Sequence, residues 1–204
     1  MAHHELTTPV NEAQVRALHV DDTVTLQGLL FGIRDATQIA LFDRDRKTRF
    51  DLAGQAVIHT APNVKKVPPS PEHPAGYAPL CVGTTTSARM ERFTRPLLGE
   101  LGVRLIIGKG GLGKASLAAF CELGGAYLAV IGGTAALETT WVEAIEDVDL
   151  DDLNPESLWR FRVRDFGPLR VAMDSHGGSI YAAVDAGARA KRAAALAALG
   201  VKAR

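Results

Sequence analysis

One local pattern occurs three times in the central part of the chain: a short apolar run, a turn that contains glycine, and a segment of helical character. The apolar runs lie at 80–82, 103–107 and 126–131. Strands that run in the same direction need long connections, and a helix is the usual connection. The repeated pattern therefore predicts an α/β fold whose central sheet is largely parallel.

The other elements follow from periodicity and from helix-start signals. Apolar and polar residues alternate over 23–31, which predicts a strand, and 55–59 reads as the next strand. Asp35 and Gln38 have the spacing of a capping box and predict a helix over 35–42. Further helices are expected at 85–101, at 113–121 and, as a short segment, after Gly133.

Three segments lie outside this pattern. Residues 1–17 are expected to form a polar arm, and the basic, alanine-rich stretch 185–204 is expected to be a C-terminal helix. The stretch 62–79 holds six of the ten prolines, which favours a long surface loop or flap over regular structure. The whole chain, residues 1–204, is expected to be a single domain.

Composition narrows the partners and the compartment. Lys plus Arg and Asp plus Glu each total 23, so no global field favours nucleic acid or an anionic membrane. The chain has two cysteines and neither a signal-like start nor an apolar run of the ~20 residues that cross a bilayer. A cytoplasmic location is therefore expected, and any anion site must be local.

Two turns carry the residues that such a site needs. The segment 83–90 brings three threonines, a serine and Arg89, and the segment 108–113 brings Lys109 among four glycines. Both turns follow predicted strands and lead into helices, which is where ligands bind in parallel sheets. We expect Thr85–Arg89 and the Lys109 turn to converge on one site for a carboxylate or a phosphate.

The second turn also matches two nucleotide-binding patterns in part. Gly108, Gly110 and Gly113 satisfy the dinucleotide glycine motif, but no acidic residue follows about 20 positions later to hold a ribose. Lys114 fits a phosphate-binding loop, but Ala115 stands where a hydroxyl should contact magnesium. A nucleotide-binding enzyme therefore stays the least favoured alternative.

Metal-ligating residues are sparse. Four histidines and both cysteines are scattered without the spacing of metal ligands, so no metal site is expected in this chain, and the cysteines read as small buried hydrophobes. These residues are His19, His59, His73, His176, Cys81 and Cys121.

The two turns together, in the order Gly83-x-Thr-Thr-Ser-Ala-Arg-Met and then Ile-Gly-Lys-Gly, resemble one known family. It is the C-terminal domain, or β subunit, of the iron–sulfur hydro-lyases, which include class I fumarases and L(+)-tartrate dehydratase. Further matches lie at 32–36, 58–62 and 171–181, so the resemblance covers about residues 18–183. It implies a swivelling β/β/α domain of three layers.

The resemblance also implies roles for individual residues. Thr85 would be the general base and Arg89 the positive charge that an alkoxide needs. The carboxylates of a C4 dicarboxylate would be bound by Arg34, Thr86, Arg89, Lys109 and Gly110. The reaction implied is reversible hydration, of fumarate to malate or between L-tartrate and oxaloacetate.

The resemblance implies a partner as well. A four-iron, four-sulfur cluster with one open iron needs three thiolates, so the cluster would belong to a larger α subunit. Two residues depart from the family pattern: Thr84 replaces a customary proline and Gln38 replaces a frequent histidine. The identity of the dicarboxylate substrate therefore stays open. The alternative function is a non-catalytic anion-binding or assembly module of the same fold, and the isolated chain could form a homodimer. The C-terminal helix either docks on the partner or is solvated.

Overall fold

The computed structural model describes residues 1–200 of the chain. Nine strands and eight helical segments follow one another in an order that is mainly alternating. Their bounds are β1 His3–Thr7, α1 Glu12–Arg16, β2 Thr23–Ile33, α2 Asp35–Phe42, β3 Ala56–His59, β4 Asn63–Lys66, β5 Tyr77–Cys81, η1 Ser87–Phe93, α3 Thr94–Gly99, β6 Leu105–Gly108, α4 Lys114–Leu123, β7 Ala126–Ala129, α5 Ala135–Thr140, β8 Val142–Asp149, η2 Asp151–Leu153, β9 Leu158–Met173 and α6 Ile180–Ala198.

The main sheet has seven strands in the order β1-β2-β3-β6-β7-β9-β8. The neighbours from β1 through β7 are parallel, while β9 runs antiparallel to β7, β8 and β2. Because β9 pairs with both β2 and β7, the strands β2, β3, β6, β7 and β9 form a closed ring. The expected α/β fold with a central, mostly parallel sheet is confirmed, and the swivelling three-layer arrangement stays a prediction.

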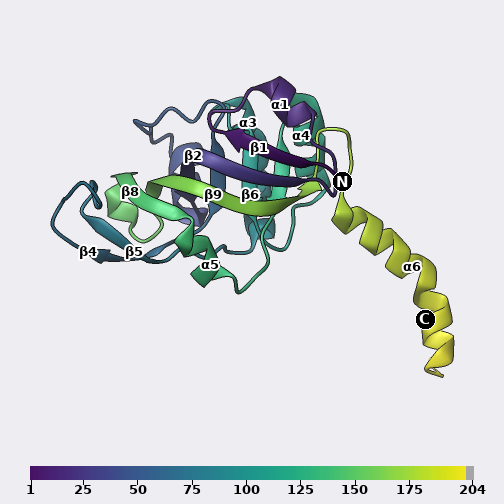
Figure 1. Cartoon of the computed structure of the whole chain (residues 1–204). Coiled ribbons are helices and arrows are strands. Elements are labelled where there is room, and N and C mark those ends of the chain that lie inside the picture. Colours follow the sequence, from purple (N-terminus) through teal and green to yellow (C-terminus); the bar gives the residue numbers. More distant parts are fainter. Residues whose placement is uncertain (201–204) are drawn as a thin grey trace.

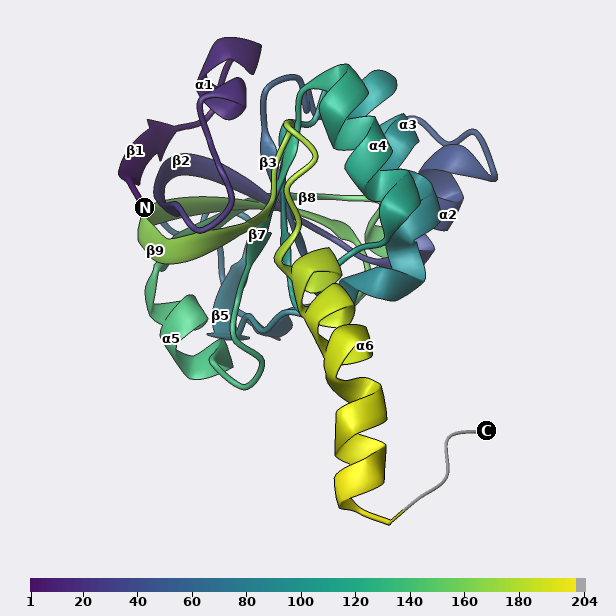
Figure 2. The ribbon, with the colours of Figure 1, turned by 90° about the vertical axis from the view of Figure 1, so that its right-hand side faces the viewer.

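Two hydrophobic cores lie on the two faces of this sheet. On β6, Leu105 and Ile107 belong to one core and Ile106 belongs to the other, as the two-residue period of a strand requires. The second core includes Leu97 of α3 and Phe120 of α4. Helices α2, α3 and α4 gather on that side of the sheet (Figure 2). The parallel strands are therefore apolar on both faces, which explains their short, continuous apolar runs.

The first 17 residues are not the polar arm that the sequence predicted. Strand β1 pairs in parallel with β2 from His3↔Thr23 to Thr7↔Gln27. Val10, Val15 and Leu18 are buried in the core that also contains Leu26 of β2. The apolar residues of this segment are too few and too irregularly spaced to predict a strand. Pairing with β2 makes β1 a strand despite its weak local pattern.

The proline-rich stretch is also more regular than expected. It contains the hairpin of β4 and β5, whose register pairs Val64 with Pro79 and Lys66 with Tyr77. Most of the prolines lie in the loop between the two strands, and a two-stranded ribbon has only edge strands, where proline is tolerated. Tyr77 anchors the hairpin with its ring edge-on to Trp159 at 5.3 Å between centroids. The hairpin projects from the body at the end opposite to α6 (Figure 1).

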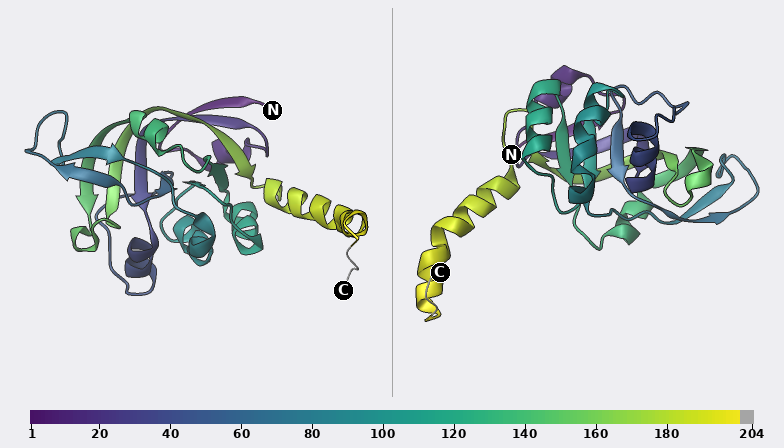
Figure 3. Two further views of the ribbon diagram at one scale, coloured as in Figure 1. Left: turned by 90° about the horizontal axis from the view of Figure 1, so that it is seen from below. Right: turned by 180° about the vertical axis from the view of Figure 1, so that it is seen from behind.

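The C-terminal helix begins at Ile180, where Ser179 accepts a hydrogen bond from the N–H of Ala182. None of its residues is buried, and it extends away from the body in every view (Figures 1 and 3). The last part of the predicted helix, 201–204, lies outside the described residues. Within residues 1–200, no helix is both long enough and apolar enough to cross a membrane.

Candidate functional site

The two polar turns meet at one edge of the sheet, as their positions after parallel strands predict. The N–H of Thr85 donates to the carbonyl of His59 at the end of β3 across 2.8 Å. The N–H of Ser87 donates to the carbonyl of Lys109 after β6 across 2.9 Å, and Thr86 and Lys109 form a parallel bridge. Both turns are thus joined to the ends of neighbouring strands.

Helix start positions differ from the prediction, and the difference affects the site. The predicted helix 85–101 is divided into the 3₁₀ helix η1 and the α-helix α3. Pro96, which has no N–H, removes one bond from an uninterrupted α-helical ladder. Helix η1 begins at Ser87, so Thr85 and Thr86 precede it, and the Thr86 side chain makes no capping hydrogen bond. Neither hydroxyl is used as a helix cap.

Arg89 connects the threonine turn to helix α2. Its Nη2 donates to the hydroxyl of Thr85 across 3.2 Å and to Oδ2 of Asp35 across 2.9 Å. Partial burial works to raise the pKa of the Asp35 carboxyl, but the hydrogen bond and charge of Arg89 lower it overall. The same ion pair raises the pKa of Arg89. A permanent positive charge therefore lies beside the Thr85 hydroxyl.

Arg34 lies between two carboxylates at the start of α2. Its Nε is 3.3 Å from Oε1 of Glu156 and 3.6 Å from Oδ2 of Asp35, but it makes no hydrogen bond within the described residues. Glu156 also accepts the N–H of Ala36 across 2.7 Å. The predicted capping box is absent because Arg34, not Asp35, is the N-cap residue. Asp35 is instead shared by the guanidinium groups of Arg34 and Arg89.

Lys109 differs from the two arginines because no carboxylate within residues 1–200 lies within ion-pair distance of its ammonium group. Its side chain runs along the turn after β7, where a Cβ atom on Gly132 would come within 3.4 Å of its Cδ. Gly110 follows in the left-handed conformation, with φ +78°, which glycine adopts at little cost. Thr86 and Gly110 are exposed. This turn can present an ammonium group and a backbone N–H together.

Glu138 of α5 is a site-proximal residue that the sequence did not point to. It is 1% exposed, its Oε1 accepts the hydroxyl of Thr134 across 2.6 Å, and its Oε2 has no partner within the described residues. Burial raises the pKa of this carboxyl, although Thr134, the N–H of Thr84 and the charge of Lys109 oppose the shift. No motif marks Glu138, so only the fold reveals it.

A buried polar chain lies beneath the site and was also missed. His59, Ser87 and Tyr127 are linked by side-chain hydrogen bonds. These three side chains explain why residue 108 is glycine, because a Cβ atom there would collide with the Ser87 hydroxyl. Burial lowers the pKa of His59 to about 4, so the imidazole is neutral near pH 7.

The glycine turn itself is not arranged for a nucleotide. Helix α4 begins at Lys114 with Gly113 as its N-cap. The carboxylate of Glu91 lies directly against that helix start, since a Cβ atom on Gly113 would come within 2.5 Å of Glu91 Oε1. A negative charge at this position repels a phosphate from the helix N-terminus.

The family model described as Fumarase C-terminus matches residues 2–184. The chain belongs to the fumarase C-terminus family. The relationship that the two turns suggested is therefore confirmed.

Three relatives show how much of each chain is shared. The L(+)-tartrate dehydratase subunit beta of Shigella sonnei is 37% identical over 178 residues, 87% of this chain and 86% of the relative. The corresponding subunit of Escherichia coli K12 is 36% identical over 178 residues, again 87% and 86%. A Geobacillus stearothermophilus protein named "Putative fumarate hydratase class I" is 38% identical over 177 residues, 86% of this chain and 33% of the relative.

The last segment of the family resemblance, residues 171–181, has a structural role here. Asp174 is buried and accepts the N–H groups of His176, Gly178 and Val20 at 2.8–2.9 Å. The carboxylate thereby fixes the turn between β9 and α6 against the loop before β2. The rings of His19 and His176 stack at 4.4 Å between centroids.

Metal-ligating groups do not come together within residues 1–200, where no set of three or more His, Cys, Asp or Glu side chains could hold a metal ion. Cys81 lies on β5 and Cys121 on α4, and both are half-buried rather than buried as expected. These two thiols cannot provide three cluster ligands.

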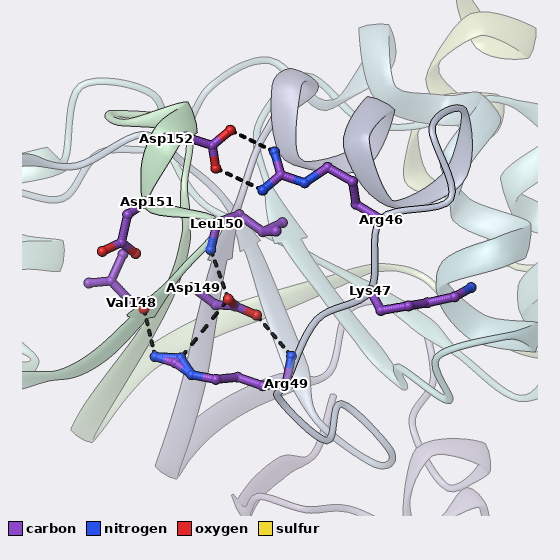
Figure 4. Close-up of a pocket in the computed structure, with 8 residues that line it drawn as sticks. All are labelled: Arg46, Lys47, Arg49, Val148, Asp149, Leu150, Asp151 and Asp152. Carbon is purple, nitrogen blue, oxygen red and sulfur yellow. Dashed lines mark hydrogen bonds and ion pairs between the residues drawn. The ribbon is translucent and has the colours of Figure 1, made fainter.

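A charged pocket between the loop after α2 and the turn after β8 shares no residue with this site (Figure 4). Arg46 donates two hydrogen bonds of 2.7 Å to Asp152, and Arg49 donates to Asp147 across 2.6 Å. The opposite charges neutralise one another, so the pocket ties two loops together and offers little to an anion.

Proposed function

We propose that this chain is the β subunit of a two-subunit iron–sulfur hydro-lyase that reversibly hydrates a C4 dicarboxylate. The observation that carries the proposal is the Thr85 hydroxyl within hydrogen-bond distance of Arg89, with Arg34 and Lys109 near the same turns. The names of the relatives, a tartrate dehydratase subunit and a class I fumarate hydratase, support it. The substrate pair is fumarate and malate, or L-tartrate and oxaloacetate.

Substrate binding follows from the three cations. A guanidinium group contacts a carboxylate at two points, whereas an ammonium group acts as a point charge. Arg34 and Arg89 would exchange part of their contact with Asp35 and Glu156 for substrate carboxylate oxygens. Lys109 would bind the second carboxylate, assisted by the N–H of Gly110 and the hydroxyl of Thr86. Since Lys109 has no carboxylate partner within residues 1–200, its charge is available.

Thr85 would act as the base in dehydration. In its alkoxide form it removes the proton from the carbon next to a carboxylate, and the electron pair of that C–H bond forms the double bond as the hydroxyl group leaves the neighbouring carbon. An alkoxide forms near neutral pH only beside strong positive charge, and Arg89 supplies that charge. In hydration the Thr85 hydroxyl returns the proton to carbon.

The leaving hydroxyl needs an electrophile, which a cluster iron provides as a Lewis acid when bound. Because two cysteines, Cys81 and Cys121, are too few to supply the three thiolates of such a cluster, we assign it to an α subunit. The relatives named "subunit beta" support the existence of that partner. The cytoplasmic location belongs to the same proposal.

The proposal is tested by co-expressing the chain with its α subunit and assaying the anaerobically purified complex against fumarate, malate and L-tartrate. We expect a brown, oxygen-sensitive complex that hydrates or dehydrates one of these pairs, and Thr85→Ala and Arg89→Ala variants that assemble without activity. Full turnover by the isolated, iron-free chain would overturn the proposal. A colourless, stable homo-oligomer that binds diacids without turnover would support the non-catalytic module instead.

A further inference from the structure

The buried chain of His59, Ser87 and Tyr127 joins three elements beneath the site. His59 Nδ1 lies 2.9 Å from Ser87 Oγ, which lies 2.9 Å from the Tyr127 hydroxyl. All three residues are at most 1% exposed. They come from β3, η1 and β7, at sequence separations of 28 and 40 residues.

The direction of the protons in this chain follows from the Tyr127 hydroxyl at its end. Within residues 1–200, one hydrogen-bonding side chain lies beside that hydroxyl, so the phenolic O–H must use it as its acceptor. Ser87 Oγ is the acceptor at hand, and the Ser87 O–H then donates to His59 Nδ1. The neutral imidazole consequently carries its proton on Nε2.

The same chain holds the groups assigned to substrate and base. The carbonyl of His59 accepts the N–H of Thr85 across 2.8 Å, and the N–H of Ser87 donates to the carbonyl of Lys109 across 2.9 Å. A shift of any one member therefore moves the base relative to the carboxylate-binding turn.

We propose that His59, Ser87 and Tyr127 are positioning residues that fix Thr85 relative to Lys109 through a one-directional hydrogen-bond chain ending in an Nε2–H imidazole. The catalytic part of this inference rests on the function proposed above, whereas the proton arrangement does not. Reversing the chain would leave two buried groups without a partner, the Tyr127 O–H and the lone pair of His59 Nε2, whereas the proposed direction leaves only the Nε2–H.

His59 is also poorly explained by packing alone. Its Nε2 has no hydrogen-bond partner within the described residues, and an apolar side chain would fill the same space without burying an unsatisfied donor. Three charged or polar groups face it from two elements: Asp35 of α2 raises its pKa, Arg89 of η1 lowers it, and Ser87 of η1 bonds its other nitrogen. The two charges oppose each other, so burial decides that the ring is neutral.

The proton arrangement can be read by nuclear magnetic resonance on the full chain. Long-range ¹H–¹⁵N spectra distinguish the two tautomers of each of the six histidines, and a His59→Gln variant assigns the signal. We expect His59 to stay in the Nε2–H form from pH 5 to 8, and Ser87→Ala to abolish the single fixed tautomer. An Nδ1–H signal, or titration near the ordinary histidine pKa, would overturn the inference.

The positioning role is tested with Tyr127→Phe and its matched control Tyr181→Phe. The two rings contact each other at 6.3 Å between centroids, but the Tyr181 hydroxyl makes no hydrogen bond within residues 1–200. In the assembled enzyme we expect Tyr127→Phe to lower kcat about tenfold and to raise the diacid KM, while Tyr181→Phe keeps both.

A merely structural role would lower the melting temperature of Tyr127→Phe but leave kcat per folded enzyme and its pH profile unchanged, and that result would sink the positioning role. If the wild-type complex is inactive, the proposed function fails while the spectra of the isolated chain still decide the proton arrangement. If Tyr127→Phe does not fold, Ser87→Ala takes its place in both measurements.

Discussion

The Arg89 guanidinium lies 3.2 Å from the Thr85 hydroxyl, although Thr85 belongs to the turn before helix η1 and Arg89 lies within that helix. The contact is therefore made across the start of the helix and not between two residues of one helical turn. Asp35 holds the guanidinium from the other side at 2.9 Å. The geometry places a fixed positive charge at the hydroxyl without using that hydroxyl to cap the helix.

Replacing Thr85 should therefore affect the chemical step and leave binding largely intact. We expect Thr85→Ala to lower kcat by about 10²- to 10⁴-fold, the usual contribution of a positioned acid–base group, with little change in KM. Thr85→Ser should retain part of the activity because it keeps the hydroxyl. Anaerobic steady-state kinetics of the assembled complex measure both, and a Thr85→Ala enzyme within tenfold of wild type would contradict the role.

Arg89→Lys tests whether geometry matters beyond charge. Lysine keeps the positive charge but cannot contact Asp35, Thr85 and a carboxylate in one plane. We expect kcat/KM for dehydration to fall by about 10- to 100-fold, or roughly 1.4–2.7 kcal/mol of transition-state stabilisation. The ascending, low-pH limb of the pH–rate profile should move to higher pH, because the Thr85 alkoxide is then less stabilised.

Arg92→Lys is the matched control for that change. Arg92 lies on the same helix η1 and donates two hydrogen bonds to Asp43, but it contacts no proposed site residue. The activity of Arg92→Lys should equal that of wild type. Equal losses in the two variants would mean that the helix, not the Thr85 contact, is what lysine disturbs.

The two polar turns could be predicted because their chemistry is local. A glycine turn after a parallel strand meets its neighbours at the same sheet edge, whatever the rest of the chain does. The pairing of β9 with β2 could not be predicted, since it joins segments more than 100 residues apart. Strand β1 was expected to be an arm for a different reason: its own residues carry no strand pattern, and its pairing with β2 makes it a strand.

The buried part of the site was hidden for a similar reason. Ser87 belongs to the first polar turn and His59 to the matching segment 58–62, but nothing in the sequence links either of them to Tyr127, and only folding brings the three together. Glu138 likewise carries no motif, and its position depends on how α5 packs beside the turn of Lys109. Surface cations at strand ends can be read from sequence, whereas the polar groups that hold them require the fold.

Glu138→Gln should change stability in a pH-dependent way. Burial raises the pKa of Glu138 above its ordinary value of 4.5, so the protonated form is the one that the fold favours. The stabilisation that Glu138 contributes is complete below the ordinary pKa of 4.5 and is lost as pH rises from there through the raised pKa. The amide keeps an acceptor for Thr134 and has no charge to bury.

Denaturant unfolding of the two proteins between pH 4 and 8 measures this difference. We expect Glu138→Gln to be more stable than wild type at pH 8 by about 1 kcal/mol and nearly equal to it at pH 4. If Glu138→Gln instead becomes less stable than wild type as pH rises, ionised Glu138 stabilises the fold through Lys109.

Asp22 should give the opposite dependence on pH. Its carboxylate accepts the N–H of Ala2 across 2.6 Å and that of His19 across 3.1 Å, and it lies 3.2 Å from His4 Nε2. The hydrogen bond from Ala2 is the main reason that its pKa falls from 3.8 to about 2. A lowered pKa stabilises the fold above the unfolded value, and this stabilisation is lost as pH falls from about 4 to about 2.

Asp22→Asn should therefore destabilise the protein at pH 7 by about 1 kcal/mol after allowance for solvent screening, and progressively less towards pH 3. The first strand should also exchange its amide hydrogens faster, because the residue ties Ala2 and His4 to the loop before β2. Asp185→Asn is the matched control: among residues 1–200, Asp185 pairs only with the exposed Arg189 on α6 at 2.9 Å, and its loss should matter by less than about 0.5 kcal/mol. Equal effects of the two variants at pH 7 would show that Asp22 does not fasten β1 to the sheet.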